Sequence, residues 1–173
     1  MKKIALILVI LLVISIGCTQ VKDDGAIMLE FTKLKQDYGV YTAFSPNTST
    51  MNDYINDLSE LRAQSSAGVS RIFDAELASA QSFYYLLTAY EKSKDIDFFP
   101  TKCNISEVRK SKNYIDTLKF ISLSIKQSDE ASLALANLNA SELDQLRSNQ
   151  LLLVKQYADQ AKSLKLELES ICS

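Results

Sequence analysis

The stretch SRIFDAELASAQSFYYLLTAYEKS, residues 70–93, decides the fold of this chain. Its apolar side chains recur at alternating steps of four and three residues, namely at Phe73, Leu77, Ala80, Tyr84 and Leu87. This spacing places them on one face of an α-helix, and such a face needs burial against other helices. The stretch therefore predicts a helix over 70–93 that packs inside a helical protein.

Two further helices are expected before this stretch, because their apolar residues repeat in the same way. The first covers about 26–38 and the second begins near 49–50, where Thr50 and Asp53 are spaced like a capping box. Gly68 lies between the second helix and the stretch quoted above, and glycine weakens a helix. We therefore expect a break near Gly68 rather than one long helix.

The remainder of the chain predicts a long helical hairpin whose turn is ambiguous. Turn residues occur near 128 and again near 137–139. The expected apolar face of the first arm carries Val108, Ile115, Leu118, Ile121 and Ile125. That of the second arm carries Leu143, Leu146, Leu153, Tyr157, Ala161, Leu164, Leu168 and Ile171, with a polar gap at Gln150.

The cysteines favour the later turn. Cys103 precedes the first arm and Cys172 follows the second, and a disulfide needs Cα atoms within about 7 Å. A turn at 128 leaves the two ends roughly 27 Å apart, given the rise per helical residue. A turn near 137–139 gives matched arms over 104–137 and 140–171. We therefore predict a Cys103–Cys172 disulfide and that turn, with a kink near 128.

Composition agrees with a helical fold. The 173 residues include four glycines and two prolines, the usual residues of turns and loops. We expect an all-α protein, an antiparallel helical bundle of about four to five helices with a long C-terminal helical hairpin. The bundle domain is expected over 26–173.

The N-terminal residues have the layout of a secretory signal peptide. Lys2 and Lys3 precede an apolar run over 4–16, and Gly17 then precedes Cys18. The Gly-Cys step resembles the cleavage site of prokaryotic lipoprotein precursors, and the ending GCTQ is similar to that of some archaeal envelope lipoproteins. No family is recognised for the residues that follow.

This resemblance covers residues 1–20 and implies an anchoring chemistry. Residues 1–17 are then a signal peptide, Cys18 carries lipid, and residues 18–25 form a tether. Ser15 departs from the pattern, because the family usually has leucine or another aliphatic residue there. An uncleaved membrane anchor over 4–21 and a cleaved, unlipidated protein are the alternatives. All three place the domain outside the cytoplasm.

Three surface features are candidates for binding or modification. The aromatic segment of the 70–93 helix offers a ligand or partner face at Phe83, Tyr84, Tyr85, Leu87 and Tyr90. Asp53, Asp57 and Glu60 form an acidic row at helical spacing, which is more often simply a solvated face. Asn47, Asn104 and Asn139 each begin an N-x-S sequence, and all three precede an expected helix.

Several classes of function lack a signature. The chain has no histidine, no C-x-x-C and no phosphate-binding loop, so we expect no enzyme, cofactor or metal site. A net charge of −2 without a basic block argues against nucleic acid. We expect a membrane-tethered bundle on the extracytoplasmic face of the membrane that binds an envelope protein. A ligand-binding or sensory bundle using the aromatic face is the alternative.

Overall fold

The computed structural model describes residues 23–39, 47–98 and 104–171. These ranges contain helices and no strand, which confirms the all-α fold. The helices in chain order are α2 (Asp24–Asp37), α3 (Thr48–Gln64), α4 (Ala67–Ser93), α5 (Ile105–Lys110), α6 (Lys112–Ala136), α7 (Ala140–Leu143) and α8 (Gln150–Glu169).

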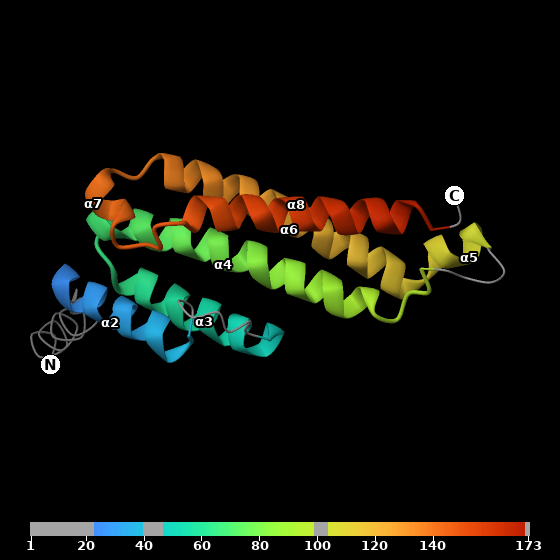
Figure 1. The fold of residues 1–173 in the computed structure, drawn as a ribbon. Coiled ribbons are helices and arrows are strands. Elements are labelled where there is room, and N and C mark those ends of the chain that lie inside the picture. The colour runs from blue at the N-terminus through green and yellow to red at the C-terminus, as the bar shows by residue number, and fades with distance from the viewer. Residues whose placement is uncertain (1–22, 40–46, 99–103, 172–173) are drawn as a thin grey trace, which may run out of the picture.

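Helix α4, the stretch quoted first, lies at the centre of the bundle (Figure 1). Its 27 residues span about 40 Å. Helices α6 and α8 run along one flank of α4, and α2 and α3 lie on the other flank (Figure 1). The arrangement confirms an antiparallel helical bundle with a C-terminal hairpin.

Small residues let α4 and α6 approach closely. Ser82 of α4 and Ser124 and Ser128 of α6 are fully buried. The hydroxyls of Ser82 and Ser128 are 2.6 Å apart, and the Ser124 hydroxyl donates to the Ser82 carbonyl at 2.9 Å. Each buried hydroxyl therefore has a partner across the seam, as a buried polar group requires.

The apolar interior forms two clusters along the axis of α4. One cluster joins α2 and α3 to the first half of α4, where Phe31 and Phe73 meet edge to face with ring centroids 5.0 Å apart. The other joins the second half of α4 to α6 and α8 around Leu86, Ile121 and Leu164. Both faces of α4 are thus buried, which explains its unusually apolar sequence.

One of the two expectations about the boundaries of α3 and α4 is wrong, and the other is confirmed. The cap of α3 is Asn47, whose side chain accepts from the Thr50 amide at 2.8 Å, so the predicted Thr50 cap is displaced. The expected break near Gly68 is confirmed and falls at Ser65 and Ser66. The Ser66 hydroxyl accepts from the Gly68 amide and caps α4, so Gly68 lies inside the first turn.

The C-terminal hairpin turns where the cysteine argument placed it. Helix α6 ends at Ala136 and α7 begins at Ala140, which confirms a turn near 137–139. Both arms are interrupted, however. Ser111 separates α5 from α6 because its side chain caps α6 at the Tyr114 amide, and residues 144–149 separate α7 from α8. Helix α6 runs without interruption through position 128, and the expected kink there stays a prediction.

The buried faces of the hairpin follow the prediction with two exceptions. In the first arm, Ile115 is 54 % exposed. In the second, Leu143 is exposed, and Val154 and Ala158 are buried beside the half-buried Leu153. The other predicted residues of the second arm are buried or, at Tyr157, half-buried, and the buried ones are Leu146, Ala161, Leu164, Leu168 and Ile171.

All three cysteines lie outside the described residues, so the Cys103–Cys172 disulfide and the lipidation of Cys18 stay predictions. Val108, shortly after Cys103, and Ile171, beside Cys172, pack in the same apolar cluster, which agrees with a bridge there. No described helix is long and apolar enough to cross a membrane. The signal peptide, the tether up to residue 22 and the alternative anchor over 4–21 also fall outside the described ranges.

Candidate functional site: an acidic groove between α2 and α3

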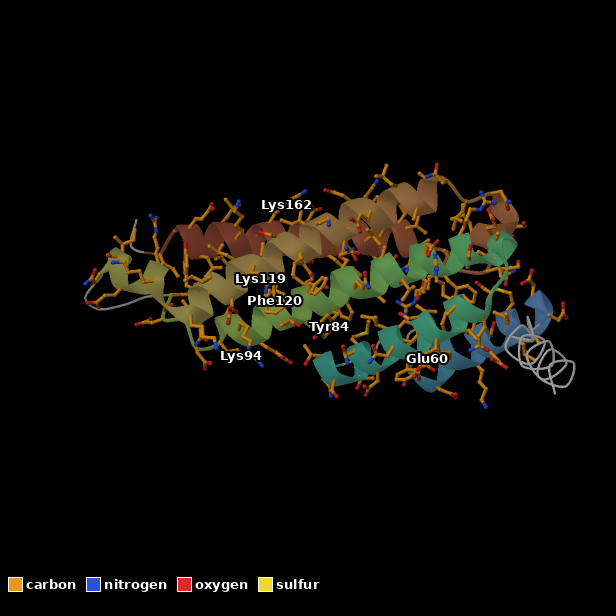
Figure 2. All side chains as sticks on the ribbon, turned by 180° about the vertical axis from the view of Figure 1, so that it is seen from behind. Glu60, Tyr84, Lys94, Lys119, Phe120 and Lys162 are labelled. Atoms are coloured by element: carbon orange, nitrogen blue, oxygen red, sulfur yellow. The ribbon has the colours of Figure 1, made fainter. Side chains whose placement is uncertain are left out.

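A groove of about 220 Å³ opens on the surface between α2 and α3. It is lined by Glu30, Leu34, Asp57, Glu60, Leu61 and Gln64. Leu61 is buried and Leu34 is half-buried, so together they form an apolar floor. Carboxylates from both helices and one amide make up the rest of the lining. Figure 2 shows Glu60 on the opposite flank of the bundle from Lys162 of α8.

The sequence singled out two of these residues only as part of an acidic row, for which a solvated face was the favoured interpretation. Asp57 and Glu60 belong to the acidic row on α3, and the structure places both in the groove. Glu30 was not predicted, because it joins them only when α2 packs against α3. Its position three residues after Ile27 and one before Phe31, both fully buried, was the available signal that it borders the α2–α3 contact.

Carboxylates dominate the local electrostatics. The Tyr38 hydroxyl donates to the Asp57 carboxylate at 2.7 Å, and this hydrogen bond is the largest reason that the pKa of Tyr38 rises to about 12. Partial burial and the negative charges of Asp57, Asp53 and Asp37 raise the pKa further. The Asp57 carboxylate is therefore bound to a protonated phenol beside the groove.

Charge is distributed unevenly over the described residues. The α2–α3 segment, residues 23–39 and 47–65, holds seven acidic and three basic residues. Of the three, Lys35 is buried and Arg62 pairs with Asp74 at 2.7 Å. The described residues from 66 onward hold fourteen acidic and twelve basic residues. Most of the net negative charge therefore belongs to the α2–α3 flank.

The aromatic segment of α4 does not line one groove in the structure. Phe83 stacks on Tyr157 of α8 with centroids 4.7 Å apart, whereas Tyr85 stacks on Phe120 of α6 at 6.2 Å. Tyr84 packs against the cluster formed with α2 and α3. Figure 2 shows Phe120 on α6 beside α4, whereas Tyr84 lies on the side of α4 that faces α3. Leu87 is half-buried and Tyr90 is 40 % exposed. The rings contact neighbours on three sides of α4, and a ligand-binding role for them stays a prediction.

A buried polar cluster fixes the position of α2 and was missed by sequence reasoning. Glu76 of α4 is almost fully buried and accepts from the Tyr54 hydroxyl at 2.8 Å and from the Gln150 amide at 3.0 Å. Lys35 of α2 is 2 % exposed and donates to the Gln145 carbonyl at 2.6 Å. Hydrogen bonds at Glu76 thus join α3, α4 and α8, and the Lys35 bond joins α2 to the connection between α7 and α8.

Burial controls the protonation of this cluster. Loss of solvent raises the pKa of Glu76, and the Tyr54 hydrogen bond and the positive charges of Lys35 and Arg147 offset only part of that rise. Loss of solvent likewise lowers the pKa of Lys35 to about 8, despite the attraction of Glu76. The Lys35 ammonium also lies 3.9 Å from the centre of the Phe31 ring.

The three N-x-S asparagines all stand directly before a helix, as the sequence predicted. Asn47 and Asn139 cap α3 and α7 through their side-chain oxygens, and Asn139 forms a full capping box with Glu142. Asn104 precedes α5 without a capping bond. All three are exposed. Helix capping explains why asparagine stands at 47 and at 139. Glycosylation of the three asparagines stays a prediction.

Within the described ranges, no three acidic or sulfur side chains come close enough to hold one metal ion. The groove carboxylates are included in that statement. No protein family matches the chain, and no curated protein or solved structure is similar to it.

Proposed function

We propose that this protein is a membrane-tethered binding module of the cell envelope. In this proposal residues 1–17 are removed on export, Cys18 carries lipid, and the helical bundle lies on the extracytoplasmic face of the membrane. One observation carries the proposal: the first 18 residues hold two lysines, a run over 4–16 whose only polar member is Ser15, and a Gly17-Cys18 step.

The geometry of the bundle supports a role close to the membrane surface. Helix α2 begins at Asp24, six residues after Cys18. Six residues span at most roughly 20 Å, so a lipid on Cys18 would hold α2 near the headgroups. The acidic α2–α3 flank would then be the first surface that a neighbouring membrane protein meets.

A binding role also suits the surface of the bundle better than catalysis does. The groove between α2 and α3 combines an apolar floor with charged walls, which is the make-up of a recognition site. The buried carboxylate Glu76 is held by a tyrosine and a glutamine inside the core. We assign it to the architecture of the bundle, since its hydrogen bonds join neighbouring helices.

Intact-mass analysis of the protein from its native membrane tests the proposal. We expect a mass that lacks residues 1–17 and carries added lipid on the new N-terminal Cys18. A Cys18→Ser variant provides the control, since it should lose the lipid and the membrane association together. A mass that retains Met1–Gly17, or a cleaved mass without lipid, would overturn the anchoring chemistry.

A further inference from the structure

We propose that the groove between α2 and α3 receives a lysine or arginine side chain from a basic segment of a partner protein. The proposal rests on the binding role given above and adds the surface and the chemistry of its partner. Its basis is the shape of the groove, the placement of its charges and the acidity of the whole α2–α3 flank.

The size of the groove limits what it can hold. Pockets that bind small molecules usually measure roughly 300–1,000 Å³, and this groove measures about 220 Å³. It is a shallow groove that is open to solvent and not an enclosed cavity. A single long side chain presented by another protein fits this volume better than an enclosed metabolite does.

The chemistry of the lining matches a basic side chain from end to end. Lysine and arginine carry an aliphatic stem and a charged head, and they commonly lay the stem on apolar surface while the head stays polar. Leu34 and Leu61 offer apolar surface for such a stem. Asp57 and Glu60, with Glu30 across the groove, offer carboxylates for the head.

Long-range electrostatics favour the same partner over a lipid surface. The α2–α3 flank carries seven acidic residues against three basic ones, so it attracts a basic segment before contact is made. Anionic headgroups would be repelled by the same charge. The negative charge of the α2–α3 flank therefore favours a basic protein partner over the surface of the membrane.

The test uses the full chain in nanodiscs of phosphatidylcholine and a synthetic helical peptide with leucine on one face and lysine on the other. We expect saturable binding with a Kd below about 1 mM, weakened by added salt. Leucine methyl resonances of Leu34 and Leu61 should shift on titration. A peptide with glutamate in place of lysine should not bind.

Paired charge reversals locate the binding. Glu60→Lys should weaken peptide binding at least tenfold, whereas Asp129→Lys, at an exposed position on α6, should change it less than twofold. Glu60→Gln should give an intermediate loss, and it guards against an effect of the reversed charge on folding. Equal losses for Glu60→Lys and Asp129→Lys would show a response to net charge alone and overturn the proposal.

The remaining outcomes are equally decisive. Absence of saturable binding, methyl shifts confined to other leucines, or tighter binding to phosphatidylglycerol vesicles than to the peptide would each overturn the groove assignment. The peptide-binding test does not depend on the lipid at Cys18, because intact-mass analysis tests that lipid separately. Peptide binding by a chain that proves to be unlipidated would leave the groove standing and remove only its placement at the membrane.

Discussion

The buried carboxylate of Glu76 gives the sharpest test of the fold. Two variants separate its charge from its hydrogen bonds. Glu76→Ala removes the acceptor of both Tyr54 and Gln150, whereas Glu76→Gln removes the charge and keeps an oxygen for the Tyr54 hydroxyl. The buried Gln150 carbonyl has no partner among the described residues, so a turned Gln150 amide can accept from the new amide of the Gln variant.

The structure sets the expected magnitudes. In Glu76→Ala two buried donors lose their acceptor, which costs about 1–3 kcal/mol each, and the buried Lys35 ammonium loses the negative charge beside it. Because both donors are left without an acceptor in the core, we expect a loss of about 4 kcal/mol in the free energy of unfolding. For Glu76→Gln we expect a change within about 1.5 kcal/mol, because burial already penalises the charged form.

Urea denaturation followed by far-ultraviolet circular dichroism measures both changes. Glu60→Ala is the matched control, because Glu60 is an exposed glutamate and its removal should cost less than about 0.5 kcal/mol. The slope against urea should stay constant across the set, which shows that the same surface is exposed on unfolding. A Glu76→Ala variant as stable as Glu60→Ala would refute the buried cluster and the packing of α8 on α4 around it.

Three further predictions follow from burial and spacing. The free energy of unfolding should rise by up to about 2 kcal/mol between pH 8 and 10. In this range Lys35 of the folded protein, with its pKa lowered to about 8, has released its proton, whereas the same lysine in the unfolded chain still binds one. Lys35→Met should abolish the rise in urea titrations at several pH values. Ser124→Leu should destabilise by about 3 kcal/mol or more, since Ser124 is fully buried at a helix seam, while Ser122→Leu at an exposed position should cost little in the same melts. A non-reducing digest should yield the Cys103 and Cys172 peptides joined, and peptides that separate without reductant would exclude the bridge.

Local spacing was enough to predict the helices and their order. The apolar repeat from Phe73 to Leu87 placed α4, and the midpoint of two cysteines placed the α6–α7 turn. Spacing alone did not predict the interruptions of the hairpin. A side-chain cap at Ser111 competes with a continuing helix, and the 144–149 connection is held by a bond from Lys35 that comes from far along the chain.

Only the α3 side of the candidate groove is visible in the sequence, because the α2 side depends on tertiary packing. A row of acids on one helix is visible at a spacing of three and four residues, so Asp57 and Glu60 could be named. The contribution of Glu30 depends on how α2 packs on α3, and that packing is decided by tertiary contacts of Ile27 and Phe31. Periodicity gives each helix its buried face but does not say which neighbour covers it.

The buried polar cluster shows what the apolar repeat of a single helix leaves out. Glu76 lies three residues after Phe73 and four before Ala80, which is a position on an apolar face, and Gln150 stood out as a polar gap in another. Taken alone, each of these polar residues only interrupts an otherwise apolar helix face. Together they form one hydrogen-bonded pair across α4 and α8. Polar residues at buried positions of two different helices are therefore better treated as potential partners of each other than as separate defects.

Helix α2 connects the buried cluster to the groove. Its outer side contributes Glu30 and Leu34 to the groove, and its inner side places Phe31 and Lys35 in the interior. The Lys35 bond to the 144–149 connection and the Asp24 bond to Ser66 at 2.6 Å hold the helix at its two ends. The spacing of α2 and α3 along the groove is thus set by contacts inside the bundle, and the Asp57 carboxylate is also held by the Tyr38 hydroxyl. A partner therefore meets helices that are already in place and bears the entropic cost of ordering only the exposed side chains of Glu30 and Glu60.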